Sequence, residues 1–496
     1  MKKSLLLILV SLTLLCYNTG LAGEKETTQG KFTVSGYVRD ALNGEMLVGV
    51  TVYCNELKTG AVSNVYGFYS LSLAPGKYSL RYSYIGFNPV EKEINLDKNI
   101  TLDINLQPVE SVLGEVVILG KRTDENVRAP EMSMVKLDIK TISKVPALLG
   151  EIDVVKVLQL LPGVQSTSEG STGFSVRGGN SDQNLILLDE ATIHNASHLI
   201  GFFSVFNNDA VKDVTLYKGD VPAAYGGRLS SLLDVRMKDG NAKKLGFTGS
   251  IGTVSSKLTI EGPIIKDRTT FLVSGRRTYA DLFLPFAKDE DVRDNKLYFY
   301  DLNLKLSHVI NENNRLYLSG YGGRDIFKNQ FASMGFGNRT GSFRWNHLFS
   351  KKLFFNLSLI YSNYNYELGT PEGDANSFKW TSRMRDYSAR FDFTSYLSGK
   401  HTLRYGATSM YHEFFPGTAY GLGNESAFTE FILPTQHALE HSLYASDEFK
   451  VTEKLTLKYG LRLALFQNIG PGTYYSFDAN YEPIDSTVYS KGHIFN

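Results

Sequence analysis

Long stretches of alternating apolar and polar residues fill the second half of this chain. In the segment KLTLKYGLRLALF, residues 454–466, leucines and Tyr459 occupy every second position, and Lys458 and Arg462 lie between them. Successive side chains of a β-strand point to opposite faces, so this segment has one apolar and one polar face. A soluble β-sandwich and a membrane barrel both contain such strands, and one strand does not distinguish them.

The spacing of turns and loops after residue 245 does distinguish the two folds. Short turn signals recur about every 40–50 residues, which leaves room for two strands of roughly 10 residues and a long loop. These turns lie near Lys266-Asp267, Asn311 to Asn314, Ser350-Lys351, Ser398-Gly399 and Thr452-Glu453. The Gly- and Asn-rich segments 329–342 and 414–426 are predicted to be long loops. Short turns on one side and long loops on the other are typical of an outer-membrane β-barrel.

Composition agrees with such a barrel. The chain has 29 Tyr and 30 Phe against 2 Trp, and aromatic residues suit both strands and the water–lipid interfaces of a barrel. The formal charge of +1 gives no bulk attraction to nucleic acid, so no nucleic-acid partner is expected.

The N-terminus MKKSLLLILVSLTLLCYNTGLAG has the features of a secretory signal peptide. Two lysines precede an apolar run, and Gly20-Leu21-Ala22 supplies the small residues that a signal peptidase reads, so we expect residues 1–22 to be removed. The run is shorter than the roughly 20 apolar residues of a spanning helix. Cys16 would permit a lipoprotein, but the residue before it is larger than lipidation sites prefer. Removal of this segment leaves Cys54 alone, so we expect no intrachain disulfide.

Residues 31–108 consist of short alternating runs separated by turn residues, which is typical of an antiparallel β-sandwich. The stretch resembles the carboxypeptidase regulatory-like domain at Gly36-Tyr37-Val38-Arg39-Asp40, Gly67-Phe68-Tyr69, Gly76-Lys77-Tyr78 and Tyr84-Ile85-Gly86-Phe87. It contains no histidine, and zinc peptidases need histidine and carboxylate ligands. We therefore expect a spacer or docking domain.

Helix and strand signals mix between residues 123 and 241. Asp153 precedes an apolar stripe that reaches Leu161 and predicts a helix of about two and a half turns. Residues 174–176 and 185–188 are predicted strands, the second buried and followed by Asp189. The ordered motifs resemble the plug domain of Bacteroidota-type TonB-dependent outer-membrane receptors: LLPGV (160–164), SVRGG (175–179), DQNLILLDE (182–190), HLIGFFSVFN (198–207) and KDVTLYKGDVPAAYGGRLSSLLDV (212–235).

The resemblance implies an all-β transmembrane antiparallel barrel of about 22 strands that encloses an α/β plug. Counting after residue 245 gives about 11 or 12 strands, and SKGHIFN at the end falls within the pattern, so the C-terminal half of the barrel is expected to be missing. An open edge in lipid costs several kcal/mol per unsatisfied group, so this portion is not expected to insert stably alone. The expected order is a signal peptide at 1–22, a sandwich at 31–108, a TonB-box linker at 109–123, the plug at 124–241 and a partial barrel at 242–496.

The resemblance also assigns a role to GEVVILGKR, residues 114–122. This run favours a strand, yet glycine flanks it and no hairpin partner adjoins it. In the family, TonB adds such a segment to its own sheet, so the resemblance implies TonB, with ExbB and ExbD, as partners. The alternatives are a final strand of the sandwich and an apolar linker that packs on the plug. The implied TonB-binding residues are Glu115, Val116, Val117, Ile118 and Leu119.

In the family, plug arginines pair with barrel carboxylates and hold the plug in place. The resemblance implies this latch role for Arg177 and Arg228, with a simple structural role as the alternative. For His194 and His198 in the plug, contact with ligand competes with a solvated polar loop. The segment 437–441, HALEH, matches an inverted zinc-peptidase motif, but on the strand expected there its histidines lie about 13 Å apart. No metal, cofactor or catalytic residue is therefore expected.

The function that the resemblance implies is TonB-energised import of a scarce solute across the outer membrane, with the N-terminal domain in the periplasm. Force on the chain drives coupling, so no enzyme activity is expected. Outer-membrane lipid, a small solute and a possible SusD-type lipoprotein lid are the other expected partners. The main alternative is an outer-membrane receptor for signalling or surface binding without transport. A secreted metalloenzyme is disfavoured by the histidine geometry.

Overall fold

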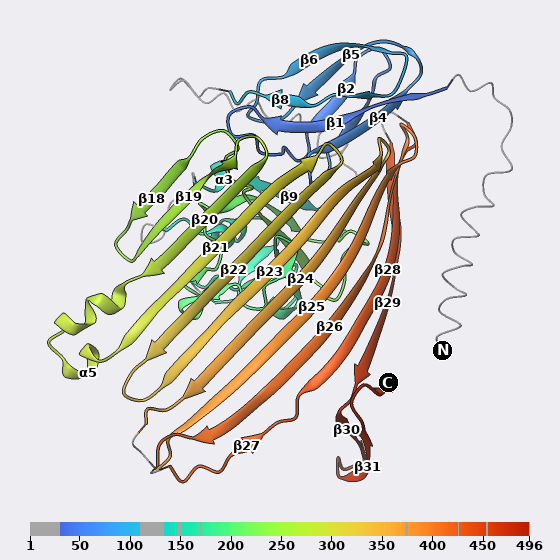
Figure 1. The fold of residues 1–496 in the computed structure, drawn as a ribbon. Helices are drawn as coiled ribbons and strands as arrows, with labels where there is room; N and C mark the ends of the chain where they lie inside the picture. Colours follow the sequence, from blue (N-terminus) through green and yellow to red (C-terminus); the bar gives the residue numbers. More distant parts are fainter. Residues whose placement is uncertain are drawn as a thin grey trace.

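The computed structural model describes residues 30–109, 133–143, 145, 151–168, 170–372, 375–424, 426–452 and 455–495. The predicted signal peptide and the predicted TonB segment 115–119 lie outside these ranges. The described residues form an N-terminal β domain, a smaller mixed domain and one long antiparallel sheet that curves around the mixed domain (Figure 1). Within these ranges the helices are all too short or too polar to cross a membrane.

The N-terminal domain is a β-sandwich, as its alternating runs predict. Its strands are β1 (Phe32–Asp40), β2 (Thr51–Cys54), β3 (Thr59–Val62), β4 (Phe68–Leu73), β5 (Gly76–Ser83), β6 (Val90–Leu96), β7 (Ile100–Thr101) and β8 (Ile104–Leu106). One sheet has the order β4-β1-β7 with β8 beside β1, and the other has the order β3-β2-β5-β6. Val34, Val52, Leu80 and Tyr82 are fully buried between them, so the domain has its own apolar core.

The second domain corresponds to the expected plug and is called the plug domain below. Its elements are β9 (Met134–Asp138), α3 (Ile139–Ile142), α4 (Val154–Leu158), β10 (Val164–Ser166), β11 (Phe174–Val176), η1 (Ser181–Gln183), β12 (Asn184–Leu188), β13 (Ala191–Thr192), β14 (Ser197–His198), η2 (Leu199–Gly201), β15 (Phe203–Ser204), β16 (Val211–Tyr217) and β17 (Ser231–Met237). The order β13-β12-β17-β16-β9 forms one sheet, in which β12 and β17 are parallel. The predicted strands at 174–176 and 185–188 are thus confirmed as β11 and β12.

The helix predicted after Asp153 is shorter than its apolar stripe indicates. Asp153 caps α4, because its Oδ1 accepts hydrogen bonds from two amides of the first turn at 2.8 and 3.1 Å. The helix nevertheless ends at Leu158. The amides of Leu160 and Leu161 bond to carbonyls three residues back, which tightens the last turn before Pro162.

The large sheet forms the third part. Its strands are β18 (Gly246–Ile251), β19 (Ser255–Ile265), β20 (Thr269–Thr278), β21 (Lys296–Asn311), β22 (Asn314–Lys328), β23 (Ser333–Ser350), β24 (Leu353–Gly369), β25 (Phe378–Tyr396), β26 (His401–Gly421), β27 (Phe431–Ile432), β28 (Gln436–Lys450), β29 (Thr456–Ile469) and β32 (Ile494–Phe495). Consecutive long strands pair antiparallel from β18 to β29. Between β20 and β21 lie η3 (Ala280–Leu282), η4 (Leu284–Phe286) and α5 (Glu290–Arg293), and β30 (Gly472–Phe477) pairs with β31 (Pro483–Tyr489).

Short turns join β19 to β20, β21 to β22, β23 to β24, β25 to β26 and β28 to β29, where the sequence predicts them. The N-terminal domain lies at this end of the sheet (Figure 1). The predicted long loops at 329–342 and 414–426 are largely wrong, because β23 and β26 contain most of these residues. These strands have 18 and 21 residues, more than the roughly 10 that cross a bilayer. Their glycines join the ladder instead of forming loops: Gly337, for example, pairs with Arg324.

The predicted alternation along β29 separates two faces of the sheet. Leu461 and Leu463 point outward and are 83% and 71% exposed. Arg462 points inward and donates to the carbonyls of Ala223 and Ala224 in the plug domain at 3.3 and 3.1 Å. Strand β29 therefore has an exposed apolar outer face and a polar inner face, the pattern of a lipid-embedded strand.

Candidate functional site: charged contacts around the plug domain

The buried strand β12 is followed by two acidic residues that reach the large sheet. Asp189 and Glu190 have backbone φ values of 48° and 75°, in the left-handed region where the chain turns back toward β13. They are only 2% and 6% exposed. Buried carboxylates are costly unless cations and hydrogen bonds compensate them, so their partners decide how the plug domain is held.

Glu190 joins all three parts of the chain. Its Oε1 accepts hydrogen bonds from the Tyr66 hydroxyl of the N-terminal domain at 2.9 Å and from Arg236 of the plug domain at 3.0 Å. Arg344 of β23 donates to the same oxygen at 3.3 Å, and Ser358 of β24 donates to Oε2. Burial would raise the pKa of Glu190, but Arg236 and Arg344 outweigh it and hold the pKa below its usual range. The carboxylate is therefore charged and fixes three domains at one point.

Asp189 makes a second link to the sheet. Its Oδ2 pairs with Lys305 of β21, and its Oδ1 accepts a hydrogen bond from the Met237 amide at 3.0 Å. Lys305 also lies 3.6 Å from Asp239, which follows β17. A single sheet cation, only 1% exposed, thus neutralises two acids of the plug domain.

A second charged cluster lies where β14 and β15 meet β20 to β22. Arg276 of β20 contacts Glu151 of the plug domain at 3.0 Å and Asp301 of β21 at 2.6 Å. His198 of the plug domain lies between Asp301 at 3.4 Å and Asp325 of β22 at 2.6 Å. Burial would lower the pKa of His198, but hydrogen bonds to the two aspartates raise it above its usual 6.5. Asp301 and Asp325 of the sheet therefore stabilise the positively charged form of His198.

His194 makes a third contact between the plug domain and the sheet. Its Nε2 lies 3.0 Å from Asp386 of β25, which also contacts His412 of β26 at 2.7 Å. The interpretation of His194 and His198 as parts of a solvated loop is wrong, since their side chains are 8% and 2% exposed. Among the described residues, no group of three or more histidine, cysteine or acidic side chains is arranged to hold a metal ion.

The N-terminal domain docks on the short-turn end of the sheet through aromatic contacts. Phe68 packs against Phe354 and Tyr396 of the sheet, with ring centroids 5.7 and 6.0 Å apart. The guanidinium of Arg315 on β22 lies 3.8 Å from the ring centroid of Tyr37. Cation–π contacts are stronger when they are desolvated. The aromatic and cation–π contacts therefore stabilise the docking of the N-terminal domain on the sheet.

Polar contacts tie the N-terminal domain to the plug domain as well. Lys212 of β16 donates to the Met46 carbonyl at 2.6 Å and lies 3.6 Å from Glu45. Glu45 also accepts a hydrogen bond from the Asp239 amide at 3.2 Å. With Tyr66 at Glu190, these contacts cover the plug domain from the short-turn end (Figure 1).

The latch role of Arg177 and Arg228 stays a prediction, and the structure shows the following contacts for the two arginines. Arg177 is exposed and donates to the hydroxyl of Ser133, the residue before β9. Arg228 is exposed and donates to the Gly227 carbonyl at 3.0 Å. Within the described ranges neither arginine forms an ion pair with a sheet carboxylate. Ion pairs that join plug and sheet include those of Glu151, Asp189, Glu190, His194 and His198, none of which was predicted as a latch.

The HALEH segment lies on β28, as expected. His437 faces outward, where its ring stacks near Tyr411 with centroids 5.9 Å apart and its Nδ1 lies 2.7 Å from the Tyr411 hydroxyl. A strand at this position confirms the geometry that argued against a helical zinc-peptidase motif.

A sheet that surrounds a plug domain with polar side chains and exposes apolar side chains outward has the architecture of a plugged β-barrel. Two family models match the chain: the CarboxypepD_reg-like domain at residues 34–118 and the TonB-dependent Receptor Plug Domain at residues 143–231. In both of these domains the chain is similar to TonB-dependent receptors.

Relatives with this description occur in Formosa agariphila. The chain is 26% identical to TonB-dependent receptor P3 over 42% of its own length and 29% identical to TonB-dependent receptor P39 over 38%. These matches span 21% and 18% of the two relatives, so the chain covers well under two thirds of their length.

Solved structures share the fold. The copper transporter OprC has a TM-score of 0.54 and 14% identity, with 74% of this chain and 59% of OprC covered. Pseudomonas aeruginosa FpvA bound to heterologous pyoverdines has a TM-score of 0.54 and 14% identity, with 74% of this chain and 54% of FpvA covered.

Proposed function

We propose that this protein is an outer-membrane receptor that imports a scarce small solute and is energised by TonB. The observation that carries the proposal is a plug domain held inside the sheet by buried ion pairs. Apolar packing alone would suffice for a plug that never moves. Buried ion pairs hold the plug domain in place, and water stabilises the separated charges once the plug domain is displaced. An energised partner that displaces the plug domain would open a path, and long strands and loops at the far end would meet the solute.

TonB would act through residues 115–119 by adding them to its sheet. The CarboxypepD_reg-like match ends at residue 118 and so overlaps this segment, and a final sandwich strand remains the alternative. The first described plug element after it is β9, an edge strand that pairs, among the described residues, only with β16. Tension from 115–119 would therefore reach β9 before the rest of the plug sheet.

The latch proposal for Arg177 takes a specific form. Arg177 donates to Ser133, and the Lys218 amide donates to the Ser133 carbonyl at 3.1 Å. These bonds hold the start of β9, where tension would arrive. Arg177 would thus secure the entry of the pulled chain. For Arg228, the candidate partner is Glu440 of β28, because a Cβ at the adjacent Gly227 would lie 3.9 Å from the Glu440 carboxylate.

The test uses the full-length receptor in cells with an intact proton gradient. A photo-crosslinking amino acid at Val117 is expected to form a crosslink to TonB, whereas the same group at Lys98, a residue of the described N-terminal domain, is not. A cysteine at Met134 on β9 is expected to react faster with a thiol reagent when the gradient is present than after a protonophore. Absence of the Val117 crosslink would overturn the TonB assignment. A crosslink without gradient-dependent reactivity would instead favour the second candidate, a receptor for signalling or surface binding.

A further inference from the structure

The outer face of the large sheet carries a charged patch toward its long-loop end. We call it the outer arginine patch, and it consists of Arg324, Arg339, Glu367, Lys379, Arg383, Arg385 and Glu413 on β22 to β26. Side chains at the alternate positions of these strands face the plug domain: Asn338 donates to the Asn195 carbonyl at 2.7 Å, and Asp386 contacts His194. The patch therefore points away from the plug domain, toward the surroundings of the sheet.

Cations outnumber carboxylates in the outer arginine patch. Glu413 is shared by Arg383 at 3.1 Å and Arg385 at 3.4 Å. Glu367 is shared by Arg324 at 3.0 Å and Lys379 at 3.1 Å. Five cations thus face two carboxylates, a formal excess of three positive charges. Such an excess on an outward surface favours an anionic ligand.

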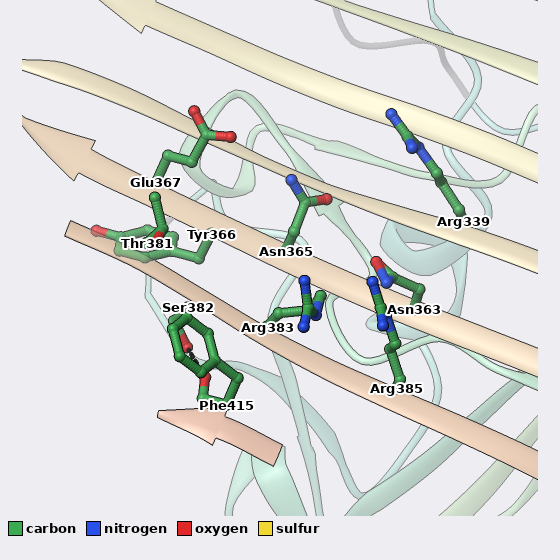
Figure 2. Close-up of a pocket in the computed structure, with 10 residues that line it drawn as sticks. All are labelled: Arg339, Asn363, Asn365, Tyr366, Glu367, Thr381, Ser382, Arg383, Arg385 and Phe415. Carbon is green, nitrogen blue, oxygen red and sulfur yellow. Dashed lines mark hydrogen bonds between the residues drawn. The ribbon is translucent and has the colours of Figure 1, made fainter. Parts of the chain in front are cut away.

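Three of these cations, Arg339, Arg383 and Arg385, line an open cavity of about 260 Å³. Arg339 reaches it from β23, Asn363 and Asn365 from β24, and Arg383 and Arg385 from β25 (Figure 2). The Nε atoms of Arg383 and Arg385 are buried without a hydrogen-bond partner in the described part of the chain. Guanidinium and amide donors that converge in this way suit the several oxygens of a phosphate group.

An apolar groove of about 500 Å³ adjoins the cavity on the same outer face. Gly341, Ala389 and Ser409 line it, and their small side chains make the sheet surface recede there. Tyr361 and Tyr387 also line the groove, with ring centroids 5.3 Å apart. The groove is exposed on the face that carries bare leucines on β29, so its natural content is hydrocarbon.

The groove and the cavity meet along two strands. Tyr361 precedes Asn363 by two positions on β24, and Arg385 precedes Tyr387 by two positions on β25, a step of about 7 Å along each strand. One molecule with a phosphate head and an acyl chain can therefore span both. A free phosphate ion would use only the cavity.

The height of the patch fits the edge of a bilayer. Phe355 and Phe393, with ring centroids 4.7 Å apart, form an aromatic pair on the outer face near the short-turn end. A strand needs about 9–11 residues to cross the hydrocarbon. Counted from Phe355 along β24 this span ends near Asn365, and counted from Phe393 along β25 it ends near Arg383. Both endpoints lie in the wall of the cavity.

We propose that the outer arginine patch and the adjoining groove bind a phosphorylated, acylated lipid of the outer leaflet, with its phosphate between Arg383 and Arg385 and an acyl chain against Ala389. Each part of the site matches one part of such a lipid. The guanidinium groups face the anionic head, and the small residues of the groove leave space for the acyl chain. The bound lipid would complete the outer surface of the sheet where its strands leave the hydrocarbon.

The test is native mass spectrometry of the full-length receptor, purified in a non-ionic detergent and stripped of lipid. The probes are phosphorylated lipid A, the same lipid A after enzymatic removal of its phosphates, and inorganic phosphate. The variants are Arg383→Gln with Arg385→Gln, which removes the head contacts, and Ala389→Leu, which fills the groove. Arg277→Gln is the matched control, because Arg277 is paired with Asp281 at 2.7 Å on β20, outside the patch.

The unmodified receptor is expected to bind phosphorylated lipid A at least tenfold more tightly than the dephosphorylated form. The double arginine variant is expected to lose that preference, Ala389→Leu to weaken binding of both lipids, and Arg277→Gln to bind like the unmodified receptor. Equal binding of both lipids would overturn the head assignment, and inorganic phosphate that displaces the lipid completely would overturn the role of the groove. Unchanged thermal unfolding of each variant verifies that lost binding is not lost folding.

Discussion

The junction at Glu190 leads to a quantitative prediction about how firmly the plug domain is held. Glu190→Gln keeps the shape of the side chain but removes its charge. Arg236 retains Asp234 at 3.0 Å, whereas Arg344 is 9% exposed and loses the carboxylate at 3.3 Å. Breaking a buried ion pair by removing one partner typically costs about 3–5 kcal/mol. We therefore expect the free energy of local opening around β12 to fall by about that amount.

Hydrogen exchange of the β12 and β17 amides measures this loss in the full-length receptor. Because 1.4 kcal/mol corresponds to about a factor of ten, the expected acceleration is roughly a hundredfold to several thousandfold. The matched control is Glu91→Gln, since Glu91 is 60% exposed and lies 4.0 Å from Arg81. An exposed pair of this kind contributes about 0–1 kcal/mol. An acceleration below tenfold at β12 in the Glu190 variant would refute the view that this carboxylate holds the plug domain.

Tyr66 permits a second measurement at the same junction. Tyr66→Phe removes the hydroxyl that donates to Glu190 at 2.9 Å, and a hydrogen bond to a charged group is worth about 1.5–3 kcal/mol. In a double-mutant cycle with Glu190→Gln, residues in direct contact should show a coupling energy of about 0.5–3 kcal/mol. Additive effects would show that the N-terminal domain does not depend on this contact.

Three further outcomes are expected. The raised pKa of His198 means that its charged form stabilises the plug contact fully below about pH 6.5 and that this stabilisation is lost as pH rises through the folded-state pKa. Amides of η2, corrected for intrinsic exchange, should therefore be better protected at pH 6 than at pH 9, and His198→Gln should abolish the difference. Arg177→Ala should speed exchange at β9 by roughly tenfold, the loss of about 1–1.5 kcal/mol for one hydrogen bond, and unchanged exchange would remove its latch role. Lys212→Met should leave Glu45, whose side chain is 15% exposed, without this cation and increase protease cleavage between the N-terminal and plug domains, whereas equal cleavage would contradict a stabilising contact there.

The strands of this protein were predictable where local pattern and burial agree. The apolar run of β12 and the alternation of β29 each follow from one segment of sequence, and both are confirmed. The Gly-rich start of β23 and the Gly-rich end of β26 were not predicted as strands. Glycine weakens a strand locally, but pairing across the sheet stabilises it. Gly337 is held by its register with Arg324, a partner that the local pattern does not reveal.

The charged contacts around the plug domain were harder to predict for the same reason. Glu190 and Arg344 are 154 residues apart in sequence, and no periodicity relates them. Two signals were present: adjacent acids directly after a buried strand, and a histidine pair of which His198 begins the motif at 198–207. Buried acids need cations, so Asp189 and Glu190 mark a contact even though the sequence leaves their partners unnamed.

The position of β9 at the margin of the plug sheet has a mechanical consequence. Its five residue pairs with β16 begin at Met134 and Tyr217, at the end nearest the incoming chain. An edge strand can separate from its neighbour one residue pair at a time when it is pulled from one end. The peak force then stays close to the force that breaks a single pair. A central strand would have to lose its hydrogen bonds to two neighbouring strands at once. A molecular motor would then need a far larger force for the same displacement.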